Sequence, residues 1–257
     1  MLDLNFVLVG GGSISRQFQK FLLRQNIKFV LLSRSNDLAT LNWKFTDVTD
    51  ERLVAEAVDY SISCLSKIDV VINFSGVHHQ VLEVGTNSLE DFLDAYNHCM
   101  DVNVKGAMLI TAAFGETLIS QRSGHLIHFC SNASNLSLYG SHAYTISKHA
   151  LVGLIKSFAT QFARHGVRIN GIAPGTVETP LNRHLLRDSE GNLGPRAKSI
   201  LSHTPSKRFI DLEGIVESLW ALSVPQRHLT GNVIYCDDGY NVEGHSWPEG
   251  NLKIYEH

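Results

Sequence analysis

The chain has 257 residues, a mass of 28.5 kDa, 44% hydrophobic residues and 18% charged residues. This composition excludes an intrinsically disordered protein, and a chain of this length buries a core without disulfides or a structural metal. The net charge of −3, without long runs of either sign, disfavours a nucleic-acid-binding protein. The four cysteines are scattered without metal-ligand spacing, which predicts buried thiols in a reducing compartment, a cytoplasmic location and no metal site.

Short apolar patterns typical of strands alternate with longer amphipathic patterns typical of helices. Strands are expected at residues 4–9, 28–33, 43–46, 69–73, 125–131, 167–173 and 232–236. Helices are expected at residues 14–23, 50–66, 89–121, 143–164 and 211–223, the third with a bend near Gly106. The first apolar run is too short for a signal peptide, and the absence of any run of about 18 apolar residues predicts that no segment spans a membrane.

Strands that are apolar on both faces, with helices between them, are typical of a parallel sheet covered on both sides. Right-handed crossovers then give a doubly wound parallel β-sheet, the Rossmann fold, as a single α/β domain over residues 1–257. In such a fold, ligands bind beyond the carboxyl ends of the strands. The candidate functional residues are therefore expected just after strands.

A glycine-rich turn, Gly-Gly-Gly-Ser-Ile-Ser at residues 10–15, follows the first strand. It matches the pattern G-x-G-x-x-G at Gly10 and Gly12, with Ser15 in the last place. Glycines at such a turn allow backbone N–H groups to approach a pyrophosphate at the helix N-terminus. Alone the motif is weak evidence, because similar turns occur without a ligand.

The second strand ends at Ser33, followed by Arg34, where an NAD-binding site usually has an acidic residue. A guanidinium suits the 2′-phosphate of NADP, because it forms bidentate, charge-assisted hydrogen bonds. The pair therefore favours NADP(H), with NAD(H) as a second option. A solvated loop arginine is the alternative interpretation.

Tyr144 and Lys148 are four residues apart in one expected helix and therefore share a face. Ser131 ends the preceding strand, and Asn103 lies in the helix before it. A tyrosine that acts near neutrality needs its pKa lowered from about 10, which takes about 4 kcal/mol of phenolate stabilisation, and a nearby ammonium favours the phenolate. A Tyr-x-x-x-Lys pair alone is more often a surface pair, so the interpretation depends on all four residues.

Together, Asn103 in Val-Asn-Val-Lys-Gly, Ser131, and Tyr144-Thr-Ile-Ser-Lys148 resemble the catalytic tetrad of the short-chain dehydrogenase/reductases. Asp47-Val48 resembles the adenine-contacting pair of that family, and Asn-Phe-Ser-Gly at residues 73–76 its Asn-Asn-Ala-Gly turn. Residues 168–180 resemble its Pro-Gly segment beside the nicotinamide, and residues 230–239 its closing strand. The resemblance covers nearly the whole chain except the C-terminal tail.

The resemblance implies the fold above, a nicotinamide cofactor and a hydride transfer between NADP(H) and a small-molecule carbonyl or alcohol. Tyr144 would give the proton, Ser131 would orient the substrate oxygen, Lys148 would lower the tyrosine pKa and hold the nicotinamide ribose, and Asn103 would anchor a relaying water. The cofactor would be bound by Gly10, Gly12, Ser13, Ile14, Ser15, Ser33, Arg34, Asp47, Val48, Asn73, Gly76, Tyr144, Lys148, Pro174, Gly175, Val177 and Thr179.

Several positions depart from the family pattern. The first turn is one residue short, and Ser15 replaces its last glycine, so cofactor affinity is expected to differ while the Ser15 hydroxyl offers an alternative phosphate donor. Phe74 and Asp238 replace a usual Asn and Gly, which we interpret as structural changes. The family's substrate lid corresponds to residues 181–208, where six Lys and Arg residues indicate either an anionic substrate or a solvated, mobile loop. His78 and His79 are expected near the mouth of the cleft, and residues 244–250 cover either the cleft or a neighbouring subunit.

The helices 89–121 and 143–164 are expected to pair with their copies in a homodimer or homotetramer, as they do in relatives. Exposed apolar stripes usually mark an interface. The surface is predicted from Met108, Ala112, Gly115, Leu151, Leu154, Ile155 and Phe158. Two other functions stay open: a non-catalytic NADP-binding regulator, which the altered glycine turn favours, and a sugar-nucleotide-modifying enzyme, whose relatives usually carry a longer C-terminal domain. No nucleic-acid or membrane partner is expected.

Overall fold

The computed structural model describes residues 4–79, 82–179, 182–225 and 228–242. Within these residues, seven parallel strands form one sheet in the order β3-β2-β1-β4-β5-β6-β7. The strands are β1 (Phe6–Val9), β2 (Phe29–Ser33), β3 (Trp43–Phe45), β4 (Val70–Asn73), β5 (Gly124–Phe129), β6 (Val167–Pro174) and β7 (Val233–Cys236). All the predicted strands are confirmed within two residues at each end, and the sheet is doubly wound.

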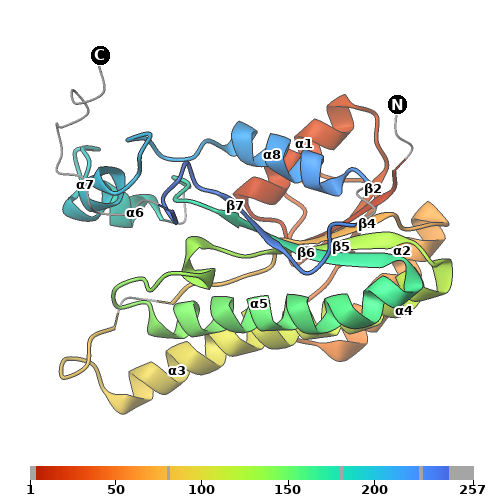
Figure 1. Cartoon of the computed structure of the whole chain (residues 1–257), viewed down its shortest axis with the longest axis horizontal. Helices are drawn as coiled ribbons and strands as arrows, with labels where there is room; N and C mark the ends of the chain where they lie inside the picture. Colours follow the sequence, from red (N-terminus) through yellow and green to blue (C-terminus); the bar gives the residue numbers. More distant parts are fainter. Residues whose placement is uncertain (1–3, 80–81, 180–181, 226–227, 243–257) are drawn as a thin grey trace.

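The helices lie on both faces of the sheet, as predicted (Figure 1). They are α1 (Ser13–Arg24), α2 (Glu51–Leu65), α3 (Leu89–Met100), α4 (Ala107–Gln121), α5 (His142–Phe162), α6 (Arg183–Leu186), α7 (Pro195–Ser202) and α8 (Leu212–Ser223). Helices α6 and α7 lie at one end of the sheet, on the left in Figure 1. The segment 181–208 therefore contains two helices that the sequence patterns did not predict.

Two apolar cores hold the layers together. Helices α1 and α8 cover one face, where Phe6 and Phe18 are completely buried. Helices α2, α4 and α5 cover the other face, where Phe114 and Phe162 are completely buried. The β strands are apolar on both faces because each face receives helices.

The expected bend near Gly106 is a π-helical turn, η1 (Asp101–Gly106), between α3 and α4. Such turns occur often at functional sites, because they locally change the direction of side chains. The continuous helical stretch Leu89–Gln121 has 33 residues, and an 18-residue window within it has a mean hydropathy of 1.2, so by length and composition alone it would suit a membrane span. A core helix passes the same test, and Ile110, Phe114 and Leu118 of this stretch pack in the core below the sheet.

The interface predicted along α4 and α5 needs correction. Leu151, Leu154 and Ile155 are buried within the chain, and a Cβ on Gly115 would meet the Phe162 ring at 2.6 Å. These side chains pack on the chain's own sheet and are not available to a partner. Of the predicted surface, Met108 and Ala112 are exposed. Other exposed apolar side chains nearby include Leu93 and Tyr96 of α3 and Ile146 of α5.

Candidate active site

The glycine turn lies directly against the turn that follows β4. Gly10 has φ +101°, and a Cβ on it would lie 3.0 Å from the Ser75 nitrogen, so a glycine is needed there for both reasons. Gly12 is the N-cap of α1, and no side chain forms a capping hydrogen bond at this end of the helix. A Cβ added to Gly12 would have no neighbouring atom within 4 Å. The helix N-terminus is therefore open to an approaching phosphate, and this geometry fits a pyrophosphate.

Ser15, which replaces the last glycine of the motif, is completely buried. Its Oγ accepts a hydrogen bond from Gln19 Nε2 at 3.2 Å. This bond leaves the hydroxyl proton free, but complete burial keeps the hydroxyl away from the open N-terminus of the helix, which argues against Ser15 as a phosphate donor. Ser13 and Ile14 are half-buried at the start of the helix, where Ser13 Oγ accepts from Arg16 Nη2 at 3.3 Å.

At the end of β2, the two predicted cofactor residues differ in exposure. Ser33 is buried, and its Oγ donates to the Ser35 carbonyl and accepts from Trp43 Nε1. Arg34 is exposed at the edge of the sheet. Hydrogen bonds from Thr49, together with the more distant Arg34 guanidinium, lower the pKa of Asp47 below its usual value. Arg34 and Asp47 therefore lie near each other, with Arg34 presented to solvent.

Asn103 sits in the π-helical turn with its carboxamide almost fully paired. Its Oδ1 accepts from Val77 N at 2.8 Å, and its Nδ2 donates to Val77 O and to Ser147 Oγ, both at 2.9 Å. Both amide protons are used, so only the second lone pair of Oδ1 stays available to a water. A Cβ on Gly76 would lie 3.4 Å from both Asn103 Oδ1 and Lys148 Nζ, which places these two groups side by side.

Lys148 is buried beside Tyr144. Its Nζ donates to the Phe129 carbonyl at 2.7 Å and lies 5.6 Å from the centre of the Tyr144 ring. Tyr144 itself is half-buried, on the same face of α5. Electrostatic stabilisation of a phenolate requires such a nearby cation.

Ser131 begins the short turn η2 (Asn132–Ser134), which packs against α5. Its Oγ accepts from the Ala133 nitrogen at 3.2 Å and retains its own proton for another acceptor. Asn241, beyond β7, donates to the Asn132 side chain at 2.7 Å and so braces this turn. Residues 244–250, predicted to cover the cleft or a subunit, lie outside the described residues.

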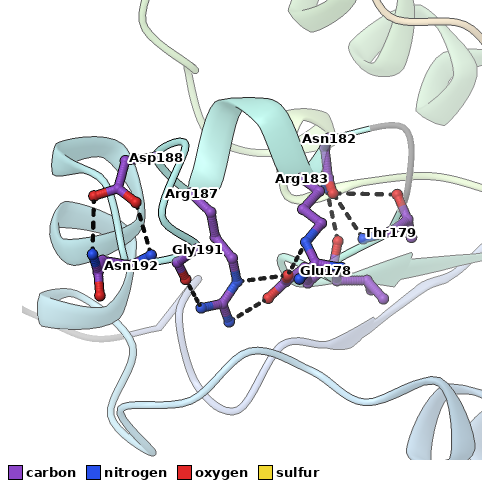
Figure 2. A network of polar contacts seen from close by, with 9 residues as sticks. Glu178, Thr179, Asn182, Arg183, Arg187, Asp188, Gly191 and Asn192 are labelled. Atoms are coloured by element: carbon purple, nitrogen blue, oxygen red, sulfur yellow. Dashed lines mark hydrogen bonds and ion pairs between the residues drawn. The ribbon is translucent and has the colours of Figure 1, made fainter.

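The segment after β6 brings the remaining predicted cofactor residues to the same edge. Gly175 is closely packed, because a Cβ there would lie 3.0 Å from both Asp237 and Ile210. Asn182 folds back on this segment: its Oδ1 accepts from Thr179 N at 2.8 Å, and its Nδ2 donates to the Val177 carbonyl at 2.8 Å (Figure 2). Pro174 ends β6, and Pro180 is outside the described residues.

Comparisons with known proteins agree with this geometry. A family model described as enoyl-(acyl carrier protein) reductase matches residues 34–241. The short-chain dehydrogenase reductase 3a of Arabidopsis thaliana is 30% identical over 198 residues, which are 76% of this chain and 74% of the relative. The chain belongs to the short-chain dehydrogenase/reductase family. It is therefore an oxidoreductase of the nicotinamide-dependent class.

Other members of the family show how far the likeness extends. Momilactone A synthase of Oryza sativa subsp. japonica is 33% identical over 204 residues, covering 78% of this chain and 72% of that protein. The solved structure of ElxO with NADP bound has a TM-score of 0.82 at 22% identity, covering 94% of this chain and 100% of that one. At this identity the structural likeness shows the fold alone.

In this short-chain dehydrogenase/reductase, His78 lies closer to the catalytic candidates than its sequence position indicated. Its ring centre is 4.7 Å from that of Tyr144, and its Nε2 is 3.0 Å from Ser141 Oγ. Burial, with a smaller effect of Arg196, lowers the pKa of His78. A cavity of about 240 Å³ also borders Tyr144, and its lining combines His79 and Leu82 with side chains of α3 and α5.

The carboxylate of Glu178, in the segment that follows β6, holds the predicted substrate lid in place. Glu178 accepts two hydrogen bonds of 2.7 Å from Arg187, and Arg183 lies 3.6 Å away (Figure 2). Arg187 also donates to the Gly191 carbonyl at 2.9 Å. Arg208 pairs with Asp238 at 3.1 Å. Three of the six basic residues are thus paired within the chain, but Arg183 and Arg187 share the single charge of Glu178, so two of the six positive charges are neutralised by these contacts. This pairing weakens the case for an anionic substrate, and the segment is folded and not an irregular loop.

Three residues of the site escaped the sequence patterns. Ser147 holds the Asn103 carboxamide, and its position directly before Lys148 was the available signal. Glu178 anchors the predicted lid but looks like an ordinary loop residue in the sequence. His128 is buried between Thr111 of α4 and Asn73 of β4 and carried no motif. Among the described residues, no group of three or more His, Cys, Asp or Glu side chains is arranged to hold a metal ion.

Proposed function

We propose that this protein transfers a hydride between NADP(H) and a small-molecule carbonyl or alcohol, with Tyr144 as the acid or base. The observation that carries the proposal is the position of buried Lys148, whose Nζ lies near the Tyr144 ring and, together with Asn103 Oδ1, beside Gly76. A structural pair on a helix surface would not bury an ammonium without a carboxylate partner, because that burial is costly. A role in stabilising a phenolate accounts for it.

The nicotinamide supplies or accepts the hydride when it is bound. In the reducing direction the Tyr144 hydroxyl donates its proton to the oxygen that becomes the alcohol, and the Lys148 ammonium stabilises the phenolate that results. Ser131 orients the same oxygen with its hydroxyl proton. Asn103 has one acceptor position left on Oδ1, which suits a water that returns a proton towards Lys148.

The preference for NADP(H) over NAD(H) rests on the end of β2. No acidic residue stands at Ser33, whose buried hydroxyl is already engaged, and the exposed Arg34 follows it. An exposed guanidinium at this edge favours a 2′-phosphate through charge-assisted hydrogen bonds.

The test has two stages. Enhancement or shift of NADPH fluorescence on mixing measures cofactor binding, and a panel of ketones, aldehydes, sugars and secondary alcohols then measures turnover. Turnover of at least one compound, lost in Tyr144→Phe, supports the proposal. Tight NADPH binding with no turnover across the panel would instead favour the non-catalytic regulator. Absence of binding to either cofactor would refute both.

We further propose a homodimer or homotetramer, built on the exposed side chains Leu93, Tyr96, Met108 and Ile146. Helices α3 and α5 pack against each other, so these apolar groups lie on neighbouring elements (Figure 1). A second copy related by a two-fold axis would cover the same surface on both chains. The cytoplasmic location stays a prediction from the sequence.

A further inference from the structure

A chain of buried hydrogen bonds runs from helix α4 to the turn after β4. His128 of β5 is completely buried and has a bonding partner on each ring nitrogen. Its Nε2 lies 2.9 Å from Thr111 Oγ1, and its Nδ1 lies 3.2 Å from Asn73 Nδ2. Asn73 and His128 are direct neighbours in the paired strands β4 and β5, so this contact is built into the sheet.

The directions of these bonds assign the protonation state of His128. The Thr111 hydroxyl donates its single proton to the Ala107 carbonyl at 2.7 Å, so its oxygen accepts from His128. Asn73 Oδ1 accepts from the Ser75 nitrogen at 3.0 Å, so its Nδ2 faces the ring and donates. His128 is therefore neutral, with the proton on Nε2. Burial, and secondarily Lys148, lower its pKa to about 3, so it stays neutral across the physiological range.

The turn that Asn73 shapes lies between two parts of the site. On one side, a Cβ on Gly10 would be 3.0 Å from the Ser75 nitrogen, so the glycine turn packs directly on it. On the other side, Gly76 lies beside Asn103 Oδ1 and Lys148 Nζ. A displacement of Asn73 would therefore move the glycine turn relative to the proton-transfer groups.

We propose that His128 is a positioning residue: by holding the Asn73 carboxamide, it sets the place of the Gly10 turn relative to Asn103 and Lys148. The effect on cofactor binding rests on the proposed function, whereas the hydrogen-bond chain belongs to the protein alone. His128 touches neither cofactor nor substrate, and it acts through Asn73.

Two variants of His128 distinguish the proposed positioning of Asn73 from a purely structural role in packing the core. In His128→Asn, the amide oxygen reaches the position of Nδ1 and can still accept a hydrogen bond from Asn73. In His128→Gln, the longer side chain places its amide at the position of Nε2, so it keeps the hydrogen bond to Thr111 and loses the one to Asn73. Both lose one buried hydrogen bond and both are expected to lower the melting temperature. The dissociation constant for NADPH should rise about tenfold in His128→Gln and stay within about twofold in His128→Asn. Thr111→Val removes the hydrogen bond between Thr111 and His128 but leaves the one between His128 and Asn73. Its dissociation constant for NADPH should therefore change as little as that of His128→Asn.

A second readout uses the protein without cofactor. In protein labelled with ¹⁵N-histidine, the His128 ring should show the neutral Nε2–H form and no titration between pH 5 and 8. The backbone amide resonances of Gly10 and Ser75 should shift together in His128→Gln and much less in His128→Asn. This measurement on the wild-type ring keeps the proposal testable if a variant does not fold.

The outcomes are distinct. Equal effects of the Asn and Gln variants on both the amide shifts and NADPH binding would overturn the proposal, as would an Nδ1–H or charged ring in the wild type. If the wild type binds neither cofactor, the proposed function fails, while the tautomer and the paired amide shifts still decide whether His128 positions the turn.

Discussion

The ammonium nitrogen of Lys148 lies 5.6 Å from the centre of the Tyr144 ring and donates to the Phe129 carbonyl at 2.7 Å. Because Phe129 ends β5, this bond links the helix that carries Tyr144 to the strand that leads to Ser131. In the proposed mechanism this one buried cation would both stabilise a developing phenolate on Tyr144 and maintain the spacing between Tyr144 and Ser131. The first prediction follows from this relationship.

Tyr144→Phe should reduce turnover by at least about a hundredfold, since it removes the proton donor from the reaction. The dissociation constant for NADPH should hardly change, because the ring and its packing are retained. Steady-state kinetics and a fluorescence titration measure the two effects. Tyr139→Phe is the matched control, since that exposed hydroxyl donates only to Glu83. A Tyr144→Phe enzyme with more than about a tenth of the wild-type rate would exclude Tyr144 as the acid.

NADPH should bind more tightly than NADH, and Arg34→Ala should narrow the difference by about 1–3 kcal/mol, the range for charge-assisted hydrogen bonds. The difference should also shrink with rising salt, because Arg34 is exposed. Isothermal titration of both cofactors checks this, with Arg164→Ala, in the short turn just after α5, as the control. Equal dissociation constants for NADPH and NADH in the wild type would be incompatible with the proposed preference.

Glu178→Gln should loosen the predicted lid by weakening the bonds to Arg187 and Arg183, and the KM for substrate should rise more than kcat falls. In the wild type, the hydrogen bonds from Arg187 lower the Glu178 pKa, so the ion pair is fully present above the ordinary glutamate pKa. It is lost as the pH falls through the lowered value. Hydrogen exchange of α6 amides against pH measures this, with Glu190→Gln as the control within the same segment. Unchanged exchange in Glu178→Gln would show that the anchor is dispensable.

Gly106→Ala should destabilise the fold by about 1–3 kcal/mol, because the new Cβ would lie 2.7 Å from Val48 Cγ2. The double variant with Val48→Ala should recover part of that loss, as a double-mutant cycle on thermal unfolding would reveal. Gly153→Ala in α5 is the control: no atom lies within 4 Å of its Cβ, so it should gain up to about 1 kcal/mol of helix propensity. If Gly106→Ala left the free energy of unfolding unchanged, the Val48 side chain would be able to move away from the new Cβ without cost.

Light scattering at micromolar concentration should give a multiple of 28.5 kDa. Met108→Asp and Tyr96→Glu should shift the mass towards that of the monomer, because each introduces a charge into the exposed apolar surface of α3 and α4. Lys156→Glu on α5 is a control that changes charge on an already polar position. A wild-type mass near 28.5 kDa with full activity would show that the monomer suffices.

The sequence by itself determined the order of the strands along the chain and the fold class. It also singled out Asn103, Ser131, Tyr144 and Lys148, whose catalytic roles stay predictions. Apolar runs bounded by turn residues identify buried strands, because a strand covered on both faces has no polar side chains to present. The spacing of Tyr144 and Lys148 is equally local, since residues four apart share a helix face.

Only the tertiary structure decided which side chains are available. Ser15 and Ser33 look like cofactor ligands in the sequence, yet both are buried, and the Ser33 hydroxyl donates its proton to the Ser35 carbonyl. Leu151 and Ile155 look like interface residues, yet the chain's own sheet covers them. Glu178 and His128 could not be recognised, because their partners lie 9 to 55 residues away. A hydrogen bond depends on where the chain returns in space, and periodicity along the sequence carries no record of that distance.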